Sequence, residues 1–299
     1  MRIVSYDFGD EQDYGFLLPG NSVIPRYFVE GVLGVSLPRD VKAFLPDREL
    51  VELIKSIIDK IPVEAISLEE LHLGPPIPNP GKIICLGLNY LDHAEEAGLE
   101  PPEGMPIFMK PATALTGPFD PIIKPRRVEK LDYEVELAVV IASRCRDIEP
   151  EEAYENIFGY MIMNDVSARD IQFRDGQWTR GKIMDTFAPT GPCLVSKEEV
   201  EDPHNLRMLT IVNGEIRQNS STSKMIRKIP EIVSILSQGM TFEPGDIIAT
   251  GTPAGVGIFH KPEPKLLQPG DAVEMWIEKI GTMRNHVISA EWASHLPHN

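Results

Sequence analysis

The chain has 299 residues, 42% of them hydrophobic and 25% charged, enough to build one large domain or a large and a small one. Lys and Arg total 29 and Asp and Glu total 45, which gives a formal net charge of -16. An acidic surface repels nucleic acid and anionic membranes, so we exclude both classes of partner.

The cysteines and the first residues indicate a reducing compartment. Cys85, Cys145 and Cys193 lie far apart and match no disulfide, zinc or redox spacing. The opening stretch MRIVSYDFGDEQDYG has no apolar signal-peptide core, and no apolar run reaches the length of about 18 residues that a membrane span needs. We therefore expect a cytoplasmic protein.

The first third of the chain predicts a small domain. Residues 1–45 alternate short apolar stretches with turns, which indicates a few short strands. Residues 47–61 repeat apolar side chains at helical spacing and predict an amphipathic helix. The stretch LGPPIPNPGK that follows contains four prolines and is typical of a linker. We divide the chain into a small N-terminal α+β domain, 1–75, and a larger domain, 76–299.

Strand signals dominate the rest of the chain. Six apolar stretches predict strands: KIICLGL, VELAVVIA, FGYMIMND, RMLTIVNG, GDIIATG and DAVEMWIEKIG. Asn213-Gly214 between two of these segments predicts a hairpin turn. Helices are fewer: PEEAYENIF, and IPEIVSILSQG with Gly239 as its C-cap. The predicted fold class is α+β and rich in strands.

Two carboxylates stand at the mouth of an otherwise apolar strand. Glu134 and Glu136 lie two residues apart, so their side chains share one face with α-carbons about 6–7 Å apart. Bare carboxylates at this distance repel each other, and Mg²⁺, Mn²⁺ or Ca²⁺ resolves the conflict. The alternative is a solvated strand end. Asp165 ends another apolar strand and is placed to face this pair, or to cap the helix that follows.

Two further stretches contain residues that suit catalysis or ligand binding. His93 and Glu96 lie three apart on a short polar helix, an arrangement that suits a general base, although a solvated helix face gives the same pattern. IIATGTPAGVG is a strand that runs into a Gly-rich loop, whose N–H groups and the hydroxyls of Thr250 and Thr252 suit an anion. Such loops are also ordinary turns.

Six ordered motifs resemble the fumarylacetoacetate hydrolase family over residues 82–290. They are NYLDHAEEAG, IFMKPATALTGP, DYEVELAVVI, MIMNDVSARD, WTRGKIMDTFAPTGP and FEPGDIIATGTPAGVG. The resemblance implies the family's mixed β-sandwich roll, preceded here by the small N-terminal domain, and a homodimer. The chain lacks the fourth acidic metal ligand and the aromatic pocket of the larger animal members, so fumarylacetoacetate is not the expected substrate.

The resemblance also implies roles for individual residues. One Mg²⁺ or Mn²⁺ per chain is expected on Glu134, Glu136 and Asp165. The expected catalytic residues are His93, Glu96 and Lys182, and the expected substrate contacts are Arg169, Gln172 and Thr252. Lys110, in FMKP, matches a family position to which we assign no role.

The implied reaction is metal-dependent hydrolysis of a C–C bond in a 2,4-dioxo acid, of the acylpyruvate kind, through a metal-stabilised enolate. Lys182 would add a positive charge where the oxyanion develops, and His93 with Glu96 would activate water. The alternatives are decarboxylation of oxaloacetate, isomerisation or dehydration of a 2-oxo acid, and a non-catalytic binding protein on the same fold. The expected partner is therefore a small 2-oxo or 2,4-dioxo acid.

Overall fold

A large mixed sheet runs through the chain, which this computed structural model describes for residues 1–8, 11–61 and 65–295. Its strands are β1 (Arg2–Phe8), β2 (Glu11–Leu18), β3 (Ser22–Pro25), β4 (Ile66–Ser67), β5 (Leu73–Gly74), β6 (Ile83–Leu86), β7 (Ile107–Lys110), β8 (Leu115–Thr116), β11 (Val135–Ile141), β12 (Ile157–Asn164), β14 (Ala188–Ser196) and β17 (Ile247–Ala249). Neighbours follow the order β4-β3-β2-β1-β14-β12-β11-β17-β6-β7, with β5 on β1 and β8 on β14.

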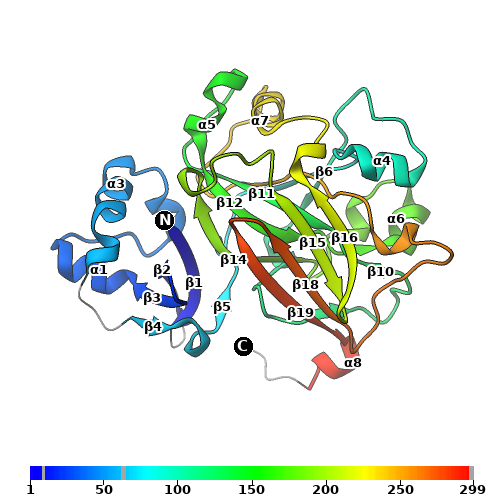
Figure 1. The fold of residues 1–299 in the computed structure, drawn as a ribbon, viewed down its shortest axis with the longest axis horizontal. Helices are drawn as coiled ribbons and strands as arrows, with labels where there is room; N and C mark the ends of the chain where they lie inside the picture. The colour runs from blue at the N-terminus through cyan, green and yellow to red at the C-terminus, as the bar shows by residue number, and fades with distance from the viewer. Residues whose placement is uncertain (9–10, 62–64, 296–299) are drawn as a thin grey trace.

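A second sheet packs across the middle of the first (Figure 1). Its strands are β9 (Ile122–Lys124), β15 (Arg207–Val212), β16 (Glu215–Ser221), β18 (Ala272–Ile277) and β19 (Gly281–Ser289), in the order β16-β15-β18-β19-β9. Strands β15, β18 and β19 lie against β11, β12 and β14, and the apolar side chains between them form one continuous core. Two short strands, β10 (Leu131–Asp132) and β13 (Ser167–Ala168), pair beside this core.

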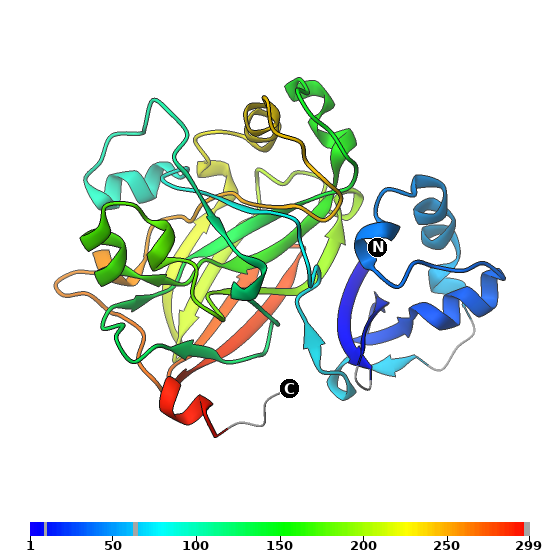
Figure 2. The ribbon, with the colours of Figure 1, turned by 180° about the vertical axis from the view of Figure 1, so that it is seen from behind.

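The helices are short and lie around the sheets. They are α1 (Arg26–Leu33), α2 (Val41–Phe44), α3 (Arg48–Ile57), α4 (Leu91–Ala97), α5 (Ala153–Asn156), α6 (Arg169–Asp175), α7 (Ile229–Ser237) and α8 (Ala290–Ala293). Helices α1 to α3 accompany β1 to β3 on one side of the molecule, and α4 and α6 lie at the opposite side, as both views show (Figures 1 and 2).

Most elements predicted from the sequence are confirmed. Each of the six predicted strands overlaps an observed one: β6, β11, β12, β15, β17 and β18. The predicted helix 47–61 is α3 followed by a 3-10 turn, and the Asp47 side chain caps it by accepting from the Leu50 N–H at 3.0 Å. The turn between β15 and β16 has positive φ at both Asn213 (51°) and Gly214 (82°), as the hairpin prediction requires. The α+β, strand-rich class is correct.

Other elements were not predicted. β14 contains Pro189, Gly191 and Pro192, residues that are typical of turns. Helices α1 and α2 lie in the segment where the sequence predicted only strands. Strand β1 pairs with β14 in the register Arg2↔Val195, so the N-terminal strands continue the sheet of the rest of the chain. The division at residue 75 stays a prediction.

Candidate active site

Three carboxylates meet where β11 begins and β12 ends. These strands are antiparallel neighbours, with Val135 opposite Asn164, so the start of one lies beside the end of the other. Glu134 directly precedes β11, Glu136 lies in it, and Asp165 directly follows β12. All three are buried, and each offers an oxygen within 4.8 Å of the others. The tertiary fold thus brings together the three acids that the sequence singled out.

Three buried cations surround these acids. Lys182 Nζ contacts Glu134 Oε2 at 2.8 Å and Asp165 Oδ2 at 2.6 Å. Arg169 donates from Nη2 to Glu134 Oε1 at 2.6 Å. Lys110 Nζ lies 2.7 Å from Asp165 Oδ1 and donates to the carbonyl oxygens of Lys182 and Phe187, the latter at 2.8 Å. Lys110 therefore fixes both the third acid and the backbone of Lys182, a role that the sequence did not reveal.

The pKa values of the two glutamates are shifted in opposite directions. Burial raises the pKa of Glu134, but the charges of Lys182, Arg169 and His93 outweigh it, and its pKa lies below the ordinary value. Burial also raises the pKa of Glu136, and the charges of Asp165 and Glu134 add to this effect, so its pKa lies well above the ordinary value. Of these two glutamates, Glu136 is therefore the one that holds a proton more readily in the absence of a cation.

The predicted acid–base pair lies beside this cluster. His93 is buried on α4, and its Nδ1 lies 3.4 Å from Glu96 Oε2. The other oxygen of Glu96 accepts from the Gly255 N–H at 2.9 Å, in the Gly-rich loop after β17. The His93 ring also lies 6.0 Å, centroid to centroid, from Phe259. The loop thus orients both members of the pair.

The predicted site residues converge on one small cavity of about 100 Å³. His93, Glu134, Glu136, Arg169, Gln172, Lys182 and Thr252 line it. Glu96 and Asp165 lie behind this lining, where they contact His93 and Lys182. Its remaining walls are largely apolar, and their aromatic side chains were not anticipated from the sequence: Phe108, Phe173, Trp178 and Phe259.

The polar groups on the cavity wall differ in what they can offer a ligand. Gln172 Oε1 accepts from Arg169 Nη1 at 3.0 Å, which leaves its amide NH₂ as a donor. The Thr252 hydroxyl donates to the Val135 carbonyl and accepts from Gln218 Nε2, both at 2.9 Å. The Thr252 hydroxyl is therefore available to a ligand as an acceptor rather than as a proton donor.

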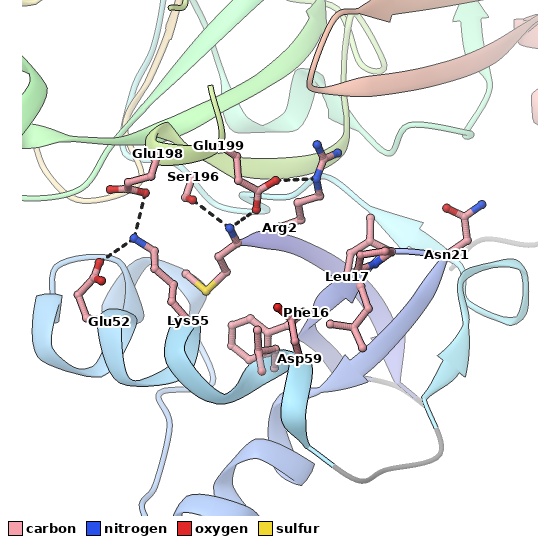
Figure 3. Close-up of a pocket in the computed structure, with 15 residues that line it drawn as sticks. Arg2, Phe16, Leu17, Asn21, Glu52, Lys55, Asp59, Ser196, Glu198 and Glu199 are labelled. Atoms are coloured by element: carbon pink, nitrogen blue, oxygen red, sulfur yellow. Dashed lines mark hydrogen bonds and ion pairs between the residues drawn. The ribbon is translucent and has the colours of Figure 1, made fainter. Parts of the chain in front are cut away.

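A larger cavity of about 770 Å³ lies away from these residues, between α3, β2 and the end of β14 (Figure 3). Five of its charged side chains are paired with one another. Lys55 bridges Glu52 at 2.7 Å and Glu198 at 2.9 Å, and Arg2 Nε contacts Glu199 at 2.9 Å. These pairs hold α3 and β1 against the segment after β14, so size alone does not locate the chemistry.

The acidic cluster fits a hard divalent cation. Its ligand atoms are carboxylate oxygens from rigid strand ends, the donor type that Mg²⁺ and Mn²⁺ prefer, and no thiolate or imidazole belongs to the cluster as described. Buried acids at such spacing repel one another unless a cation or a proton intervenes, as the raised pKa of Glu136 shows.

The comparison with known families agrees with this arrangement. Residues 82–288 match the family model for the fumarylacetoacetate (FAA) hydrolase C-terminal domain. The chain belongs to the fumarylacetoacetate hydrolase family. The predicted family is therefore confirmed.

Curated relatives extend the match beyond this domain. Oxaloacetate tautomerase FAHD2A, mitochondrial, of Bos taurus is 43% identical over 257 residues, which cover 85% of this chain and 81% of that protein. Oxaloacetate tautomerase YisK of Bacillus subtilis is 47% identical over 244 residues, which cover 80% of this chain and 81% of that protein.

Solved structures share the fold. Maleylpyruvate hydrolase from Sphingobium sp. SYK-6, in complex with manganese(II) and pyruvate, is 29% identical, with a TM-score of 0.78 over 97% of this chain and 99% of that one. The 2-hydroxyhepta-2,4-diene-1,7-dioate isomerase from Mycobacterium marinum is 33% identical, with a TM-score of 0.75 over 97% and 99%. The family thus includes tautomerases, isomerases and hydrolases of small acids, and one neighbour binds Mn(II).

The comparisons confirm the family and its fold. C–C hydrolysis, the choice between Mg²⁺ and Mn²⁺, the individual residue roles, the homodimer and the cytoplasmic location stay predictions. Among the described residues no helix has the length and apolar character to cross a membrane. The names of some relatives carry the word mitochondrial, so the compartment differs within the family.

Proposed function

We propose that the chain catalyses proton transfer at C3 of a small 2-oxo acid, and that keto–enol tautomerisation of oxaloacetate is its reaction. The observation that carries this proposal is the convergence of His93, Lys182 and the acidic cluster on one cavity of about 100 Å³. Tautomerisation needs a single acid–base group and no water nucleophile. Relatives named oxaloacetate tautomerase at 43% and 47% identity support the same reaction.

The charge of the site suits an anionic substrate. Four buried carboxylates face three buried cations at the site: Asp132, Glu134, Glu136 and Asp165 against Lys110, Arg169 and Lys182. A divalent cation held by these acids would make the total charge of these seven groups positive, and it would supply Lewis acidity to a 2-oxo oxygen. The amide NH₂ of Gln172 then gives the carboxylate of the substrate a donor within the same cavity.

Lys182 is the fixed positive charge of the mechanism. Burial lowers its pKa, but the charges of Asp165 and Glu134 outweigh this effect, and the pKa of Lys182 lies above its ordinary value. The ammonium therefore stays protonated. It stabilises negative charge on the substrate oxygen as the C3 proton leaves, an effect worth about 3 kcal/mol for a preorganised donor in a dry site.

His93 carries the proton. Its Nδ1 faces the Glu96 carboxylate at 3.4 Å, so Nδ1 keeps its hydrogen, and Nε2 takes the proton from C3 and returns it to the 2-oxo oxygen. Glu96 also stabilises the imidazolium that forms. Because the loop N–H of Gly255 holds the other Glu96 oxygen, the carboxylate is fixed in position for this task.

Hydrolysis of a C–C bond in a 2,4-dioxo acid is the second candidate. The same pair is able to activate water for attack at C4, and the maleylpyruvate hydrolase neighbour supports this reading. Decarboxylation of oxaloacetate requires no nucleophile. It produces the same enolate, so the residues of the site would stabilise the same negative charge on the substrate oxygen. These reactions share loss of a group or proton at C3 and differ in what departs.

Proton NMR in D₂O separates the three reactions. With oxaloacetate and Mn²⁺-free, Mg²⁺-loaded protein, a tautomerase replaces the C3 hydrogens with deuterium and leaves the four-carbon acid intact. A decarboxylase produces pyruvate, and a hydrolase produces it only from a 2,4-dioxo acid. The Lys182→Met protein and Mg²⁺ alone measure the background. C3 exchange no faster than this background would refute tautomerisation.

A further inference from the structure

Asp132 is a fully buried acid that the proposed reaction does not use. It lies in β10, two residues before Glu134, and both of its carboxylate oxygens are occupied. Oδ1 accepts from the N–H groups of Tyr133 at 2.9 Å and Gly257 at 2.7 Å. Oδ2 accepts from the Ile258 N–H at 3.0 Å and from Arg169 Nε at 2.8 Å. One side chain therefore joins three separate segments.

On one side, Asp132 fixes the arginine of the acidic cluster. Arg169 donates from Nε to Asp132 and from Nη2 to Glu134 Oε1 at 2.6 Å, while Nη1 reaches Gln172 at 3.0 Å. A guanidinium is planar, so an acceptor that fixes Nε also fixes the directions of both Nη groups. The orientation of Glu134 thus depends on Asp132 through Arg169.

On the other side, Asp132 fixes the loop on which α4 rests. Gly255 and Phe259 of this loop contact Glu96 and His93. Asp132 accepts from two of the N–H groups between them, those of Gly257 and Ile258. The approach is close. A Cβ added at Gly257 would lie 2.5 Å from Asp132 Oδ1, nearer than a real contact allows. The loop therefore packs directly on the carboxylate.

We propose that Asp132 is a positioning residue that couples the placement of α4, with its acid–base pair, to the grip of Arg169 on Glu134. The coupling rests on the proposed site, but it concerns binding and motion and holds whichever reaction the site performs. When the loop and α4 are ordered, Glu134 is held in the orientation that binds the cation. Because linkage is reciprocal, cation binding in turn favours the ordered state of α4.

Asp132→Asn tests the coupling. All four groups around the carboxylate are donors, so the amide NH₂ must face two of them whichever way it turns. We expect Mn²⁺ affinity, by calorimetry, to fall on the order of 10- to 100-fold, as for other residues that orient a ligand. We expect amide exchange in α4, which Asp132 does not touch, to rise about 10-fold, the effect of losing one hydrogen bond to a charged group.

Asp246→Asn is the matched control. Asp246 is also fully buried, accepts from two backbone N–H groups, Lys82 at 2.9 Å and Glu243 at 2.8 Å, and pairs with Lys82 Nζ at 2.6 Å. Asp246 lies before β17, whereas the Gly-rich loop of the site lies after β17. The control should lose stability and retain both Mn²⁺ affinity and α4 protection.

A second variant perturbs the loop under α4 without removing a contact of Arg169. The Tyr133 hydroxyl donates to the Gly255 carbonyl at 3.1 Å and leaves Arg169 untouched. Tyr133→Phe should therefore raise exchange in α4 and, because the coupling is reciprocal, lower Mn²⁺ affinity by less than Asp132→Asn does. Folded Asp132→Asn with parental Mn²⁺ affinity, or with α4 exchange no faster than in Asp246→Asn, overturns the proposal. If Asp132→Asn does not fold, unchanged α4 exchange in Tyr133→Phe overturns it.

Discussion

Glu134 is one of the three acids proposed to hold the cation. Its low pKa keeps it ionised, and it shares Lys182 with Asp165. Glu134→Gln removes one anionic ligand, so Mn²⁺ affinity measured by calorimetry should fall about 100-fold or more, above the range seen for residues that only orient ligands. Glu243→Gln, the same change at a half-exposed acid outside the cluster, is the control. An affinity equal to that of the parent would show that Glu134 is not a ligand.

Glu136 makes cation binding pH-dependent. Its raised pKa means that the cation-free folded chain keeps a proton there above the ordinary glutamate value of 4.5. This contribution to stability is present below the unfolded pKa and is lost as pH rises through the folded pKa. A cation must displace the proton, so Mn²⁺ affinity should increase with pH until Glu136 ionises unaided. Calorimetry in buffers of different ionisation enthalpy should detect up to about one proton released. Heats independent of the buffer would contradict the assignment.

His93 and Glu96 should act as a unit. His93→Ala should lower kcat by a factor on the order of 10²–10⁴, the usual worth of a positioned acid–base group. Oxalate affinity should stay nearly unchanged, because the cation and Lys182 hold it. Glu96→Gln should behave similarly, and the double variant should be little worse than either. Glu95→Gln, an exposed neighbour on α4, is the control. Full turnover of every accepted substrate by His93→Ala would remove the pair from the mechanism.

Residue spacing predicted part of this site and could not predict the rest. The i, i+2 rule placed Glu134 and Glu136 on one face, and the structure brings their oxygens together with Asp165. Lys110 lies 55 residues before Asp165, and Arg169 lies 37 residues after Asp132. Such contacts depend on which strands become neighbours, and no local pattern in the sequence carries that information.

Helix α4 is the element expected to respond to ligand. It carries the acid–base pair, ends at Gly98 in the left-handed region, and is followed by a polar segment with Pro101 and Pro102. Closure of such segments commonly excludes water from a reaction. Oxalate, which mimics the enolate of pyruvate, should slow amide exchange across residues 88–102 in Mg²⁺-loaded protein. Equal protection with and without oxalate would show that α4 is not a lid.

Strands with a clear apolar run were predictable, and strands with turn residues were not. Apart from Glu136 and Asn164 at the site, β11 and β12 carry no charged or amide side chain, because both faces are buried between packed layers. β14 is buried as well, but its proline and glycine residues hide it in the sequence. β14 pairs with β1 on one side and with β12 on the other. A prediction that omits β14 therefore also omits the continuity of the sheet from the N-terminal segment to the site.

The molecule has a charge-dependent contact across the predicted domain border. His72 lies just before β5, and its Nδ1 and Nε2 contact Asp7 at 2.5 Å and Asp120 at 2.8 Å. Asp7 belongs to β1. Asp120 follows β8 and accepts from the Gly117 N–H at 2.8 Å. The imidazolium is the only form of histidine that donates to both carboxylates, so the charged ring ties the N-terminal segment to the rest of the chain.

This contact should make stability depend on pH. The hydrogen bond to Asp7 raises the pKa of His72, burial opposes it, and the bond to Asp120 adds to it. A raised folded pKa gives stability that is full below the unfolded pKa of about 6.5 and is lost as pH rises through the folded value. His72→Gln should therefore lower Tm at pH 6 and matter less at about pH 9. His286→Gln, at an exposed histidine of β19, should change Tm equally little at both. Thermal melts of the three proteins decide the matter, since a His72→Gln deficit that is constant with pH would mean that the ring packs there without carrying charge.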